Sequence, residues 1–206
     1  MKRGNSQVKI IAITGGVATG KTTVAKILSS LLKAKIIDAD EIVHELLVPG
    51  EKIWKEVVRC FGEDILRKDL YINKKILGQC IFGDISQRKK LEQIVHPAVK
   101  KNIKEKLKQL RKDHHEWVIV DIPLLFEAKM QKIADKVIVV VRKRKFQLET
   151  LRKIKKLSAK EAENRINSQL PLSEKVKLAD FVVDNNGEIQ ETEKQVRETL
   201  FSLKNV

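Results

Sequence analysis

The residues with the clearest chemical meaning form a glycine-rich stretch near the start of the chain. They fit the pattern G-x-x-x-x-G-K-[ST] in the order Gly15, Gly16, Val17, Ala18, Thr19, Gly20, Lys21 and Thr22. Glycines allow such a loop to turn its backbone N–H groups toward phosphate oxygens, and the helix that follows adds its positive N-terminal end. In this pattern the lysine reaches the β- and γ-phosphates and the hydroxyl after it ligates Mg²⁺. The stretch therefore predicts an ATP site, with Lys21 on the phosphates and Thr22 on the metal.

Acidic residues stand where two apolar segments end. Asp38 and Asp40 follow one segment, and Asp121 ends another. In a parallel α/β sheet these ends face the crevice that holds the ligand. Carboxylates at that edge can hold Mg²⁺ with its waters or accept a proton from an acceptor hydroxyl. The alternatives are a helix cap for one member of the first pair, and an ordinary loop-starting aspartate for Asp121.

A phosphate loop by itself does not separate kinases from GTPases, motors or ATPases. A GTPase is expected to carry N-K-x-D for guanine, but the segment Asn73-Lys74-Lys75-Ile76 lacks the aspartate. The segment 184–187 matches D-x-x-G nominally, and we interpret it as an ordinary turn near the end of the chain.

Five short apolar segments are needed to position these residues. They are rich in Val and Ile without alternation, which is typical of buried strands in a parallel sheet covered on both faces. The segments are residues 8–13, 35–38, 117–121, 136–141 and 180–184. Helical patterns between them predict a doubly wound α/β fold.

The helical patterns have recognisable beginnings and ends. A helix is expected from Lys21 to Leu32, another from the capping box at Ser158 to about Gln169, and a last one over about 188–203. An apolar stripe with charges opposite runs from Leu91 to Leu110, and Pro97 inside it predicts a break or restart. Residues 50–115 show no clear strand and are expected to form a helical insertion.

Composition limits the class of protein. The chain has 206 residues and a formal net charge of +15, with 42% hydrophobic and 33% charged residues, which excludes a disordered or fibrous chain. The longest apolar run, 137–141, is too short for a transmembrane helix, and we expect the polar residues 1–7 to be a lead-in rather than a targeting segment. Two cysteines without a CxxC pattern indicate reduced thiols in a cytoplasmic protein.

The excess positive charge has two interpretations. It favours anionic partners such as phosphorylated metabolites or nucleic acid, but lysine-rich and glutamate-rich surfaces also occur in heat-adapted proteins. Aromatic residues make up only 4% of the chain, whereas binders of single-stranded nucleic acid interleave aromatic with basic residues. No nucleic-acid partner and no membrane partner is therefore expected.

Taken together, several segments resemble one family of enzymes, the dephospho-CoA kinases. The resemblance covers essentially residues 8–200. The segments that carry it are Thr14–Ala25, Ile37–Asp40, His44–Leu46, Phe61-Gly62, His96-Pro97, Ile122–Glu127, Arg165–Gln169, Ala179-Asp180 and Asp184–Gly187.

The resemblance implies a P-loop NTPase fold, a five-stranded parallel sheet flanked by helices, with a helical insertion and a small helical lid. The nucleotide-binding core corresponds to 1–49, 116–141 and 173–206, the CoA-binding insertion to 50–115 and the lid to 142–172. It implies transfer of the γ-phosphoryl group of ATP to the ribose 3′-hydroxyl of dephospho-CoA, giving coenzyme A and ADP, with Mg²⁺ as the cofactor. Oligomeric state is left open between a monomer and a weak homo-oligomer.

The resemblance also implies roles for individual residues. The stretch from Gly15 to Thr23 cradles the ATP phosphates, Asp40 is the general base, and Asp38 supports the metal or the base. Asp121 ligates Mg²⁺ through water. His96 lines the acceptor site, although a histidine before a proline can also simply satisfy backbone carbonyls. The remaining expected contacts are Pro123, Leu124, Leu125, Phe126 and Glu127 with the acceptor, and Asn185 and Asn186 beside the adenine.

Two departures from the family pattern matter for chemistry. Ala18 replaces a glycine, which is acceptable if the position needs no positive φ. The lid lacks the family's arginines, whose places are taken by Thr150 and Ile154. A replacement must come from Arg142, Lys143, Arg144, Lys145, Arg152, Lys153, Lys155, Lys156 or Arg165. We expect Arg165 first and Lys153 second as the cation that neutralises the transferring phosphoryl group, the alternative being that this basic run is only a solvated surface.

Two other functions compete with this one. One is a kinase for a different nucleotide or nucleoside acceptor. The other is a non-catalytic P-loop protein that binds nucleic acid, which the carboxylates Asp38, Asp40 and Asp121 disfavour because they repel a phosphate backbone.

Overall fold

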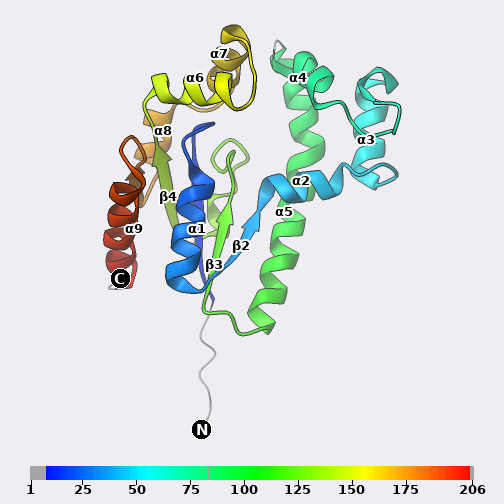
Figure 1. The fold of residues 1–206 in the computed structure, drawn as a ribbon. Helices are drawn as coiled ribbons and strands as arrows, with labels where there is room; N and C mark the ends of the chain where they lie inside the picture. Colours follow the sequence, from blue (N-terminus) through cyan, green and yellow to red (C-terminus); the bar gives the residue numbers. More distant parts are fainter. Residues whose placement is uncertain (1–7, 83, 205–206) are drawn as a thin grey trace. The chain divides into compact units, whose positions relative to one another are not determined.

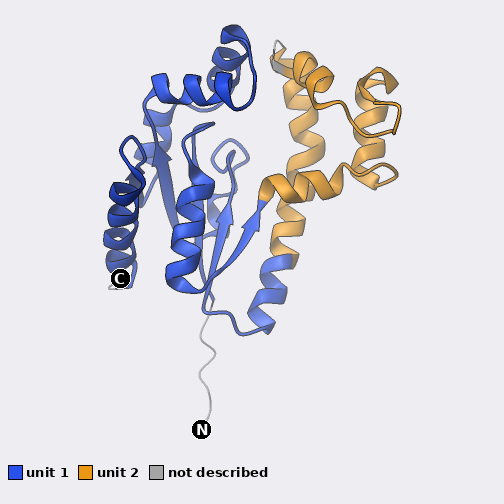
Figure 2. Cartoon of the chain, in the orientation of Figure 1, with its two compact units in different colours: residues 1–38, 106–206 blue, residues 39–105 orange. Residues whose placement is uncertain are grey.

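The computed structural model describes residues 8–82 and 84–204 and forms two compact units. The first comprises residues 1–38 and 106–206, and the second comprises residues 39–105 (Figures 1 and 2). The polar segment 1–7, expected to be a lead-in, lies outside the described residues. In the part of the chain that is described, no helix has both the length and the apolar character needed to cross a bilayer.

The first unit is built on a five-stranded sheet, as predicted. All neighbouring strands run parallel, in the order β2-β3-β1-β4-β5, so the strand that leads into the phosphate loop lies in the middle. The strands are β1 (Lys9–Gly15), β2 (Lys35–Asp38), β3 (Trp117–Asp121), β4 (Lys136–Val141) and β5 (Phe181–Asp184).

Helices and two 3₁₀ turns connect the strands (Figure 1). They are α1 (Lys21–Leu32), α2 (Ala39–Leu46), α3 (Lys52–Phe61), η1 (Glu63–Ile65), α4 (Lys74–Phe82), α5 (Ile85–Lys112), η2 (Gln131–Ile133), α6 (Arg144–Lys153), α7 (Ala159–Asn167), α8 (Leu172–Lys177) and α9 (Ile189–Lys204). The capping box predicted at Ser158 is present and begins α7, with the Ser158 hydroxyl accepting from the Glu161 N–H.

The core of the first unit lies between the sheet and the pair α1 and α9. Alternate residues of the strands point to one face, where they meet the apolar sides of these two helices. The members from the helices are Val24, Ala25, Leu28, Val196 and Leu203, and those from the strands are Ile11, Ile13, Trp117, Ile119, Ile138, Val140 and Val183.

The outer strands depart from the expectation of a sheet buried on both faces. Ile36 of β2 keeps 38% of its surface exposed and Val182 of β5 keeps 41%. Both strands lie at the edges of the sheet. Their apolar sequences predict the strands correctly, but they do not predict that one residue of each strand stays exposed to solvent.

The second unit is helical, as predicted for the insertion, and holds α2, α3, α4 and most of α5. Its described residues contain an isolated bridge between Leu66 and Ile72 but no named strand. The boundaries expected from the sequence were 50 and 115, whereas the compact unit runs from 39 to 105.

The break predicted at Pro97 is wrong, because α5 continues through it from Ile85 to Lys112. Proline removes one N–H from the helical ladder, but the apolar face stays buried on both sides of it, at Val95, Val99 and Ile103. Packing of that face favours one uninterrupted helix, and Pro97 itself is exposed.

Candidate active site

The phosphate loop joins β1 to α1 and requires glycine at two positions. Gly15 has φ +152°, and a Cβ there would stand 2.3 Å from the carbonyl oxygen of Val140. Gly20 has φ +89°, and its Cβ would stand 2.0 Å from Nδ2 of Asn185. Both distances are far too short for real Cβ contacts, so the neighbouring backbone and Asn185 fix these glycines.

Internal hydrogen bonds hold the loop in a closed turn. The Thr19 hydroxyl and the Lys21 ammonium both donate to the carbonyl oxygen of Gly16, at 3.0 and 2.8 Å. Thr19 is completely buried, whereas Thr22 and Thr23 in the first turn of α1 are exposed. The loop thus presents an ammonium, two hydroxyls and a helix N-terminus on one small surface, which suits an anionic oligophosphate.

Ala18 is in the left-handed region, with φ 57°. Alanine can replace glycine without cost only where φ is negative. That condition is not met at Ala18. The loop accepts a strained alanine at the place where the related proteins are expected to have glycine.

Two of the predicted carboxylates meet at the sheet edge. Asp38 of β2 is the register partner of Asp121 of β3, and Asp121 in turn is aligned with Ile13 of β1. Neighbouring strands lie about 4.8 Å apart. Asp121 therefore ends next to the strand that enters the phosphate loop, and Asp38 ends one strand further out. Asp121 is only 4% exposed and Asp38 is half-buried.

These residues fit a magnesium ion held mostly by substrate. Mg²⁺ in kinases is usually bound by one or two carboxylates together with phosphates and waters, not by a full protein cage. Two aligned carboxylates and the Thr22 hydroxyl form such a partial donor set.

Asp40 and His96 belong to the second unit. Helix α2 begins at Ala39, so Asp38 occupies the position before the helix and Asp40 lies exposed in its first turn. His96 is half-buried in α5. Their parts in catalysis and acceptor binding stay predictions.

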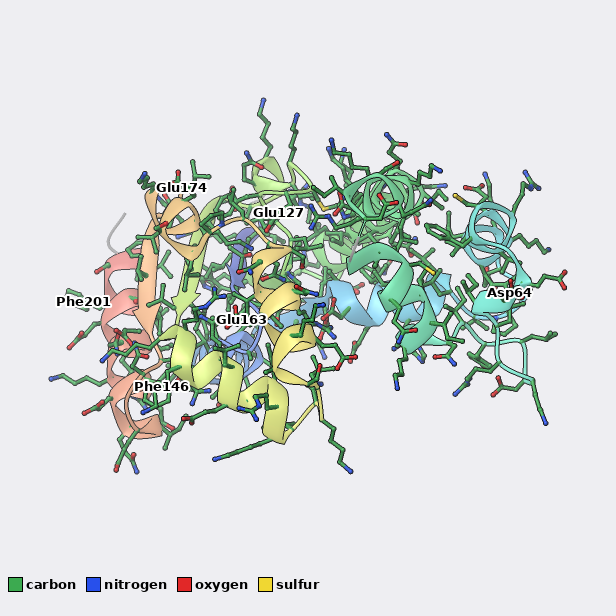
Figure 3. The ribbon with its side chains drawn as sticks, turned by 90° about the horizontal axis from the view of Figure 1, so that it is seen from above. Asp64, Glu127, Phe146, Glu163, Glu174 and Phe201 are labelled. Carbon is green, nitrogen blue, oxygen red and sulfur yellow. The ribbon has the colours of Figure 1, made fainter. Side chains whose placement is uncertain are left out.

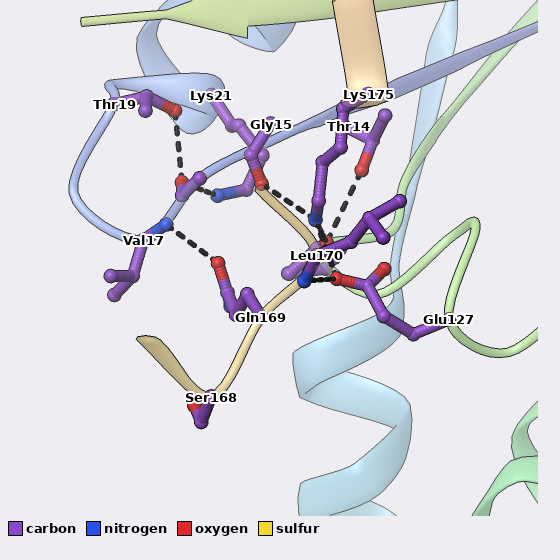
Figure 4. Close-up of polar contacts among 12 residues, drawn as sticks. Thr14, Gly15, Val17, Thr19, Lys21, Glu127, Ser168, Gln169, Leu170 and Lys175 are labelled. Carbon is purple, nitrogen blue, oxygen red and sulfur yellow. Dashed lines mark hydrogen bonds and ion pairs between the residues drawn. The ribbon is translucent and has the colours of Figure 1, made fainter. Parts of the chain in front are cut away.

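The segment after β3 is held from inside the first unit. Leu125 and Phe126 are buried, while Pro123, Leu124 and Glu127 are half-buried. Their contacts with an acceptor stay predictions. The Glu127 carboxylate is already engaged, since its Oε1 accepts from the Leu170 N–H at 2.9 Å and pairs with the Lys175 ammonium at 2.9 Å (Figure 4).

The structure gives Lys175 and Gln169 contacts that the sequence analysis did not predict. Lys175 has no exposed surface, although its segment, LSEKVK, looks like any polar helix. Gln169 accepts through Oε1 from the Val17 N–H of the phosphate loop, at 2.9 Å (Figure 4). Neither contact has a local signal, because the partners lie far apart in the sequence.

Asn185 and Asn186 brace the loops around the phosphate site. Asn185 donates to the carbonyl oxygen of Thr19 at 2.8 Å and accepts from Thr192 at 2.9 Å. Asn186 accepts from the Lys143 N–H at 2.7 Å, at the start of the lid. Contact with adenine stays a prediction for both.

The segment 142–172, predicted to be the lid, borders a cavity of about 390 Å³ that Gly16 of the phosphate loop also lines. Arg142 and Arg144 contribute to its wall, whereas Arg165 and Lys153 are exposed on α7 and α6. The Arg142 guanidinium lies 5.6 Å from the Phe146 ring and donates to the Thr150 hydroxyl at 3.4 Å.

Arg144 is already paired within the lid. Its guanidinium forms an ion pair with Glu163 of α7 and donates to Asn167. Figure 3 labels Glu163 on α7 and Phe146 on α6, seen from above. Arg142 therefore has the less compensated charge at the cavity wall.

The second unit has a hollow of its own, about 640 Å³, lined by residues of α2, α3 and α5. Its lining combines apolar residues with three lysines. These residues include Leu46, Ile53, Ile94, Pro97, Lys52, Lys90 and Lys101.

A central strand that passes through a phosphate loop into a helix, with carboxylates at the ends of the two strands on one side of it, defines a P-loop nucleotide-binding enzyme. The family model described as dephospho-CoA kinase matches residues 9–191. The chain therefore belongs to the dephospho-CoA kinase family.

Individual relatives agree with this assignment. A protein of Carboxydothermus hydrogenoformans named dephospho-CoA kinase is 44% identical, and the match covers 91% of this chain and 90% of that protein. The solved structure of TT1252 from Thermus thermophilus has a TM-score of 0.79 at 27% identity, over 95% of this chain and 97% of the other. A dephospho-CoA kinase from Campylobacter jejuni has a TM-score of 0.67 at 29% identity, over 96% and 98%.

Proposed function

We propose that this protein transfers the γ-phosphoryl group of ATP to the ribose 3′-hydroxyl of dephospho-CoA, giving coenzyme A and ADP, the last step of coenzyme A synthesis. The observation that carries the proposal is a complete phosphate loop, glycines, lysine and threonine in place, in a chain of the dephospho-CoA kinase family. Phosphoryl transfer needs mainly positioning and neutralisation of charge, and the loop supplies both.

ATP binds with its phosphates along the stretch from Gly15 to Thr23. Lys21 leaves or shares its contact with the Gly16 carbonyl to meet the phosphate oxygens. Thr22, Asp38 and Asp121 are the residues that would hold Mg²⁺, directly or through water. When bound, that ion offsets negative charge on the β- and γ-phosphates. Asn185 and Asn186 border the adenine.

Asp40 is the general base toward the ribose hydroxyl. It follows the strand edge at Asp38 by two residues, and its carboxylate is exposed rather than locked in a core. A carboxylate within hydrogen-bond reach of the hydroxyl takes its proton as the bond to phosphorus forms. Asp38 supports the metal or orients this base.

His96 and the segment Pro123–Glu127 are the residues proposed to contact the acceptor. The second unit, taken by itself, has a hollow that suits parts of such a ligand. A volume of about 640 Å³ is suited to a ligand of this size. Its apolar residues suit the pantetheine arm, and Lys52, Lys90 and Lys101 suit the diphosphate.

The cation that neutralises the transferring phosphoryl group comes from the lid. Arg165 and Lys153 are the candidates from sequence, and we place Arg142 ahead of them because it lines the cavity beside Gly16. We further propose that the protein works in the cytoplasm as a monomer or weak homo-oligomer, on a small-molecule substrate.

The decisive experiment is an assay of purified protein with ATP, Mg²⁺ and dephospho-CoA, following coenzyme A and ADP by liquid chromatography. Coenzyme A is expected in a one-to-one ratio with ADP. AMP, CMP and nucleosides serve as competing acceptors. Equal or faster phosphorylation of any of these would make this a kinase for another acceptor, and steeply salt-dependent RNA binding without phosphoryl transfer would make it a nucleic-acid binder.

A further inference from the structure

One lysine of the first unit is completely enclosed. Lys175 of α8 has 0% exposed surface, which is rare for a lysine unless its charge is paired. Its ammonium donates to the carbonyl oxygens of Pro123 at 3.0 Å and Gly15 at 3.3 Å, and it pairs with Oε1 of Glu127 at 2.9 Å (Figure 4).

The three acceptors match the three N–H bonds of the ammonium group. Burial of such a charge is costly unless every donor has a partner, so the contacts fix the position of the ammonium group closely. The acceptors come from two separate segments, the end of β1 and the loop after β3, and the lysine that joins them lies on α8. The lysine therefore ties segments that are up to 160 positions apart in the chain.

The contact with Gly15 has a consequence for the phosphate loop. A peptide unit is planar and trans, so the N–H of Gly16 points opposite to the C=O of Gly15. The ammonium that binds this carbonyl therefore sets the direction of the first amide of the loop. That amide belongs to the stretch that binds phosphate.

The contact with Pro123 fixes the second loop in the same way. Its carbonyl oxygen accepts from both Lys175 and the Thr14 hydroxyl, the latter at 3.2 Å. Glu127, in the same loop, also accepts from the Leu170 N–H, and the neighbouring Gln169 accepts from the Val17 N–H. One connected network thus joins the phosphate loop, the loop after β3 and the end of the lid (Figure 4).

We propose that Lys175 is a positioning residue for phosphoryl transfer. Its contacts orient the Gly15–Gly16 peptide so that the Gly16 N–H faces the nucleotide, and they fix the Pro123–Glu127 loop relative to the phosphate loop. The inference rests on the proposed function for its kinetic consequence. Its effect on nucleotide binding can be measured without any turnover.

The test uses three variants of the full chain. Lys175→Met keeps the length of the side chain and removes the donors, but it leaves Glu127 buried without its cation and is expected to lower the melting temperature. The double variant Lys175→Met with Glu127→Met removes both charges, and such replacements are often neutral or stabilising. Lys177→Met is the matched control, since Lys177 lies on the same helix but is exposed and paired with Glu174.

Binding of a non-hydrolysable ATP analogue is measured by calorimetry, together with kcat, KM for ATP and the melting temperature. We expect the double variant to stay folded, to melt above the single variant Lys175→Met because no buried charge is left unpaired, and to bind the analogue about tenfold more weakly, the effect of one or two lost hydrogen bonds. Lys177→Met is expected to keep all four values.

A merely structural lysine would change the melting temperature and leave affinity and kcat of the folded protein unaltered. Analogue affinity within twofold of the unaltered protein in a folded double variant would therefore overturn the inference, as would an equal loss in Lys177→Met. Unaltered protein that binds the analogue but makes no coenzyme A would contradict the proposed function instead, and the binding comparison would still decide the role of Lys175.

Discussion

At the scale of single residues, the phosphate loop is defined by what its positions exclude. Gly15 and Gly20 have no room for a Cβ, because a carbonyl oxygen and the Asn185 amide occupy that space. Ala18 shows the opposite case, a position with room for a side chain and a backbone that disfavours one. The chemical groups, Lys21 and Thr22, then follow at the start of α1, where the helix supports negative charge.

Replacement of Lys21 by Ala is expected to impair both ATP binding and rate. Its ammonium is the cation of the loop, and removal of one such group from a phosphate site costs on the order of 100-fold or more in kcat/KM. Steady-state kinetics and calorimetry with an ATP analogue measure the two effects. Lys26→Ala, on the exposed side of the same helix, is the control and should behave as the unaltered protein.

Replacement of Asp40 by Asn is expected to lower kcat by about 10²- to 10⁴-fold while ATP affinity stays within about twofold, because general-base catalysis is lost and the phosphate loop is intact. Glu41→Gln, a neighbouring exposed carboxylate in the first turn of α2, is the matched control. A collapse of ATP affinity with turnover of the bound complex preserved would make Asp40 a metal or structural residue.

Replacement of Ala18 by Gly is expected to stabilise the protein modestly. Replacement by Gly removes the cost of the left-handed conformation for a non-glycine residue, about 1–2 kcal/mol. It also destabilises the folded state by about 0.4–1 kcal/mol, because glycine gives the unfolded chain more conformational freedom. A net gain of roughly 0.5–1 kcal/mol in the free energy of unfolding follows, measurable by urea titration. Lower stability in Ala18→Gly would show that the loop compensates the strain elsewhere.

At the scale of elements, the segment predicted to be the lid combines a well-capped helix with an unusual distribution of charge. The capping box fixes the start of α7, and the pair between Arg144 and Glu163 joins α6 to α7. Arg142, just before α6, reaches across to Thr150, one of the two places where the family is expected to have arginine. The Arg142 guanidinium thus lies next to Thr150, a position where the family is expected to carry an arginine.

Comparison of Arg142→Ala with Arg165→Ala identifies the lid cation. We expect kcat to fall about 100-fold in Arg142→Ala and less than about 10-fold in Arg165→Ala, because only the first side chain lines the cavity with Gly16. KM for ATP and the melting temperature are measured alongside, so that a folding defect is recognised. The reverse order of effects would return the role to Arg165, and an unchanged rate in both would point to Lys153.

At the scale of the whole molecule, the net charge of +15 is large for a chain of this length. Both substrates of the proposed reaction are polyanions, so a positive field raises their local concentration and speeds their encounter with the enzyme. The same composition is also typical of heat-adapted surfaces. The two interpretations differ in how activity responds to salt.

If the charge serves substrate capture, KM for dephospho-CoA should rise several-fold between about 0.02 and about 0.3 M NaCl, while kcat changes little, because salt screens exposed charges beyond about 10 Å at 0.1 M. Glycine betaine at the same osmolality is the control for osmotic effects. A salt-independent KM with a high melting temperature would favour the interpretation of heat adaptation.

The sequence by itself determined the elements and the chemistry of the loop. Near-continuous Val and Ile runs predict the five strands, and the pattern from Gly15 to Thr22 predicts the turn between β1 and α1, since both depend on local backbone preference and periodicity. The carboxylates at strand ends were also predictable, because parallel strands end at one edge. Pro97 was misjudged, because tertiary packing outweighed a local preference.

The tertiary structure alone decided which distant residues meet. Asp38 is aligned with Asp121 because β2 lies beside β3. The sequence of a single segment does not predict this strand order. Lys175 has the same sequence surroundings as an exposed lysine. It is buried because α8 packs where two carbonyl oxygens and a carboxylate converge, and such convergence depends on the fold of the whole unit rather than on local sequence.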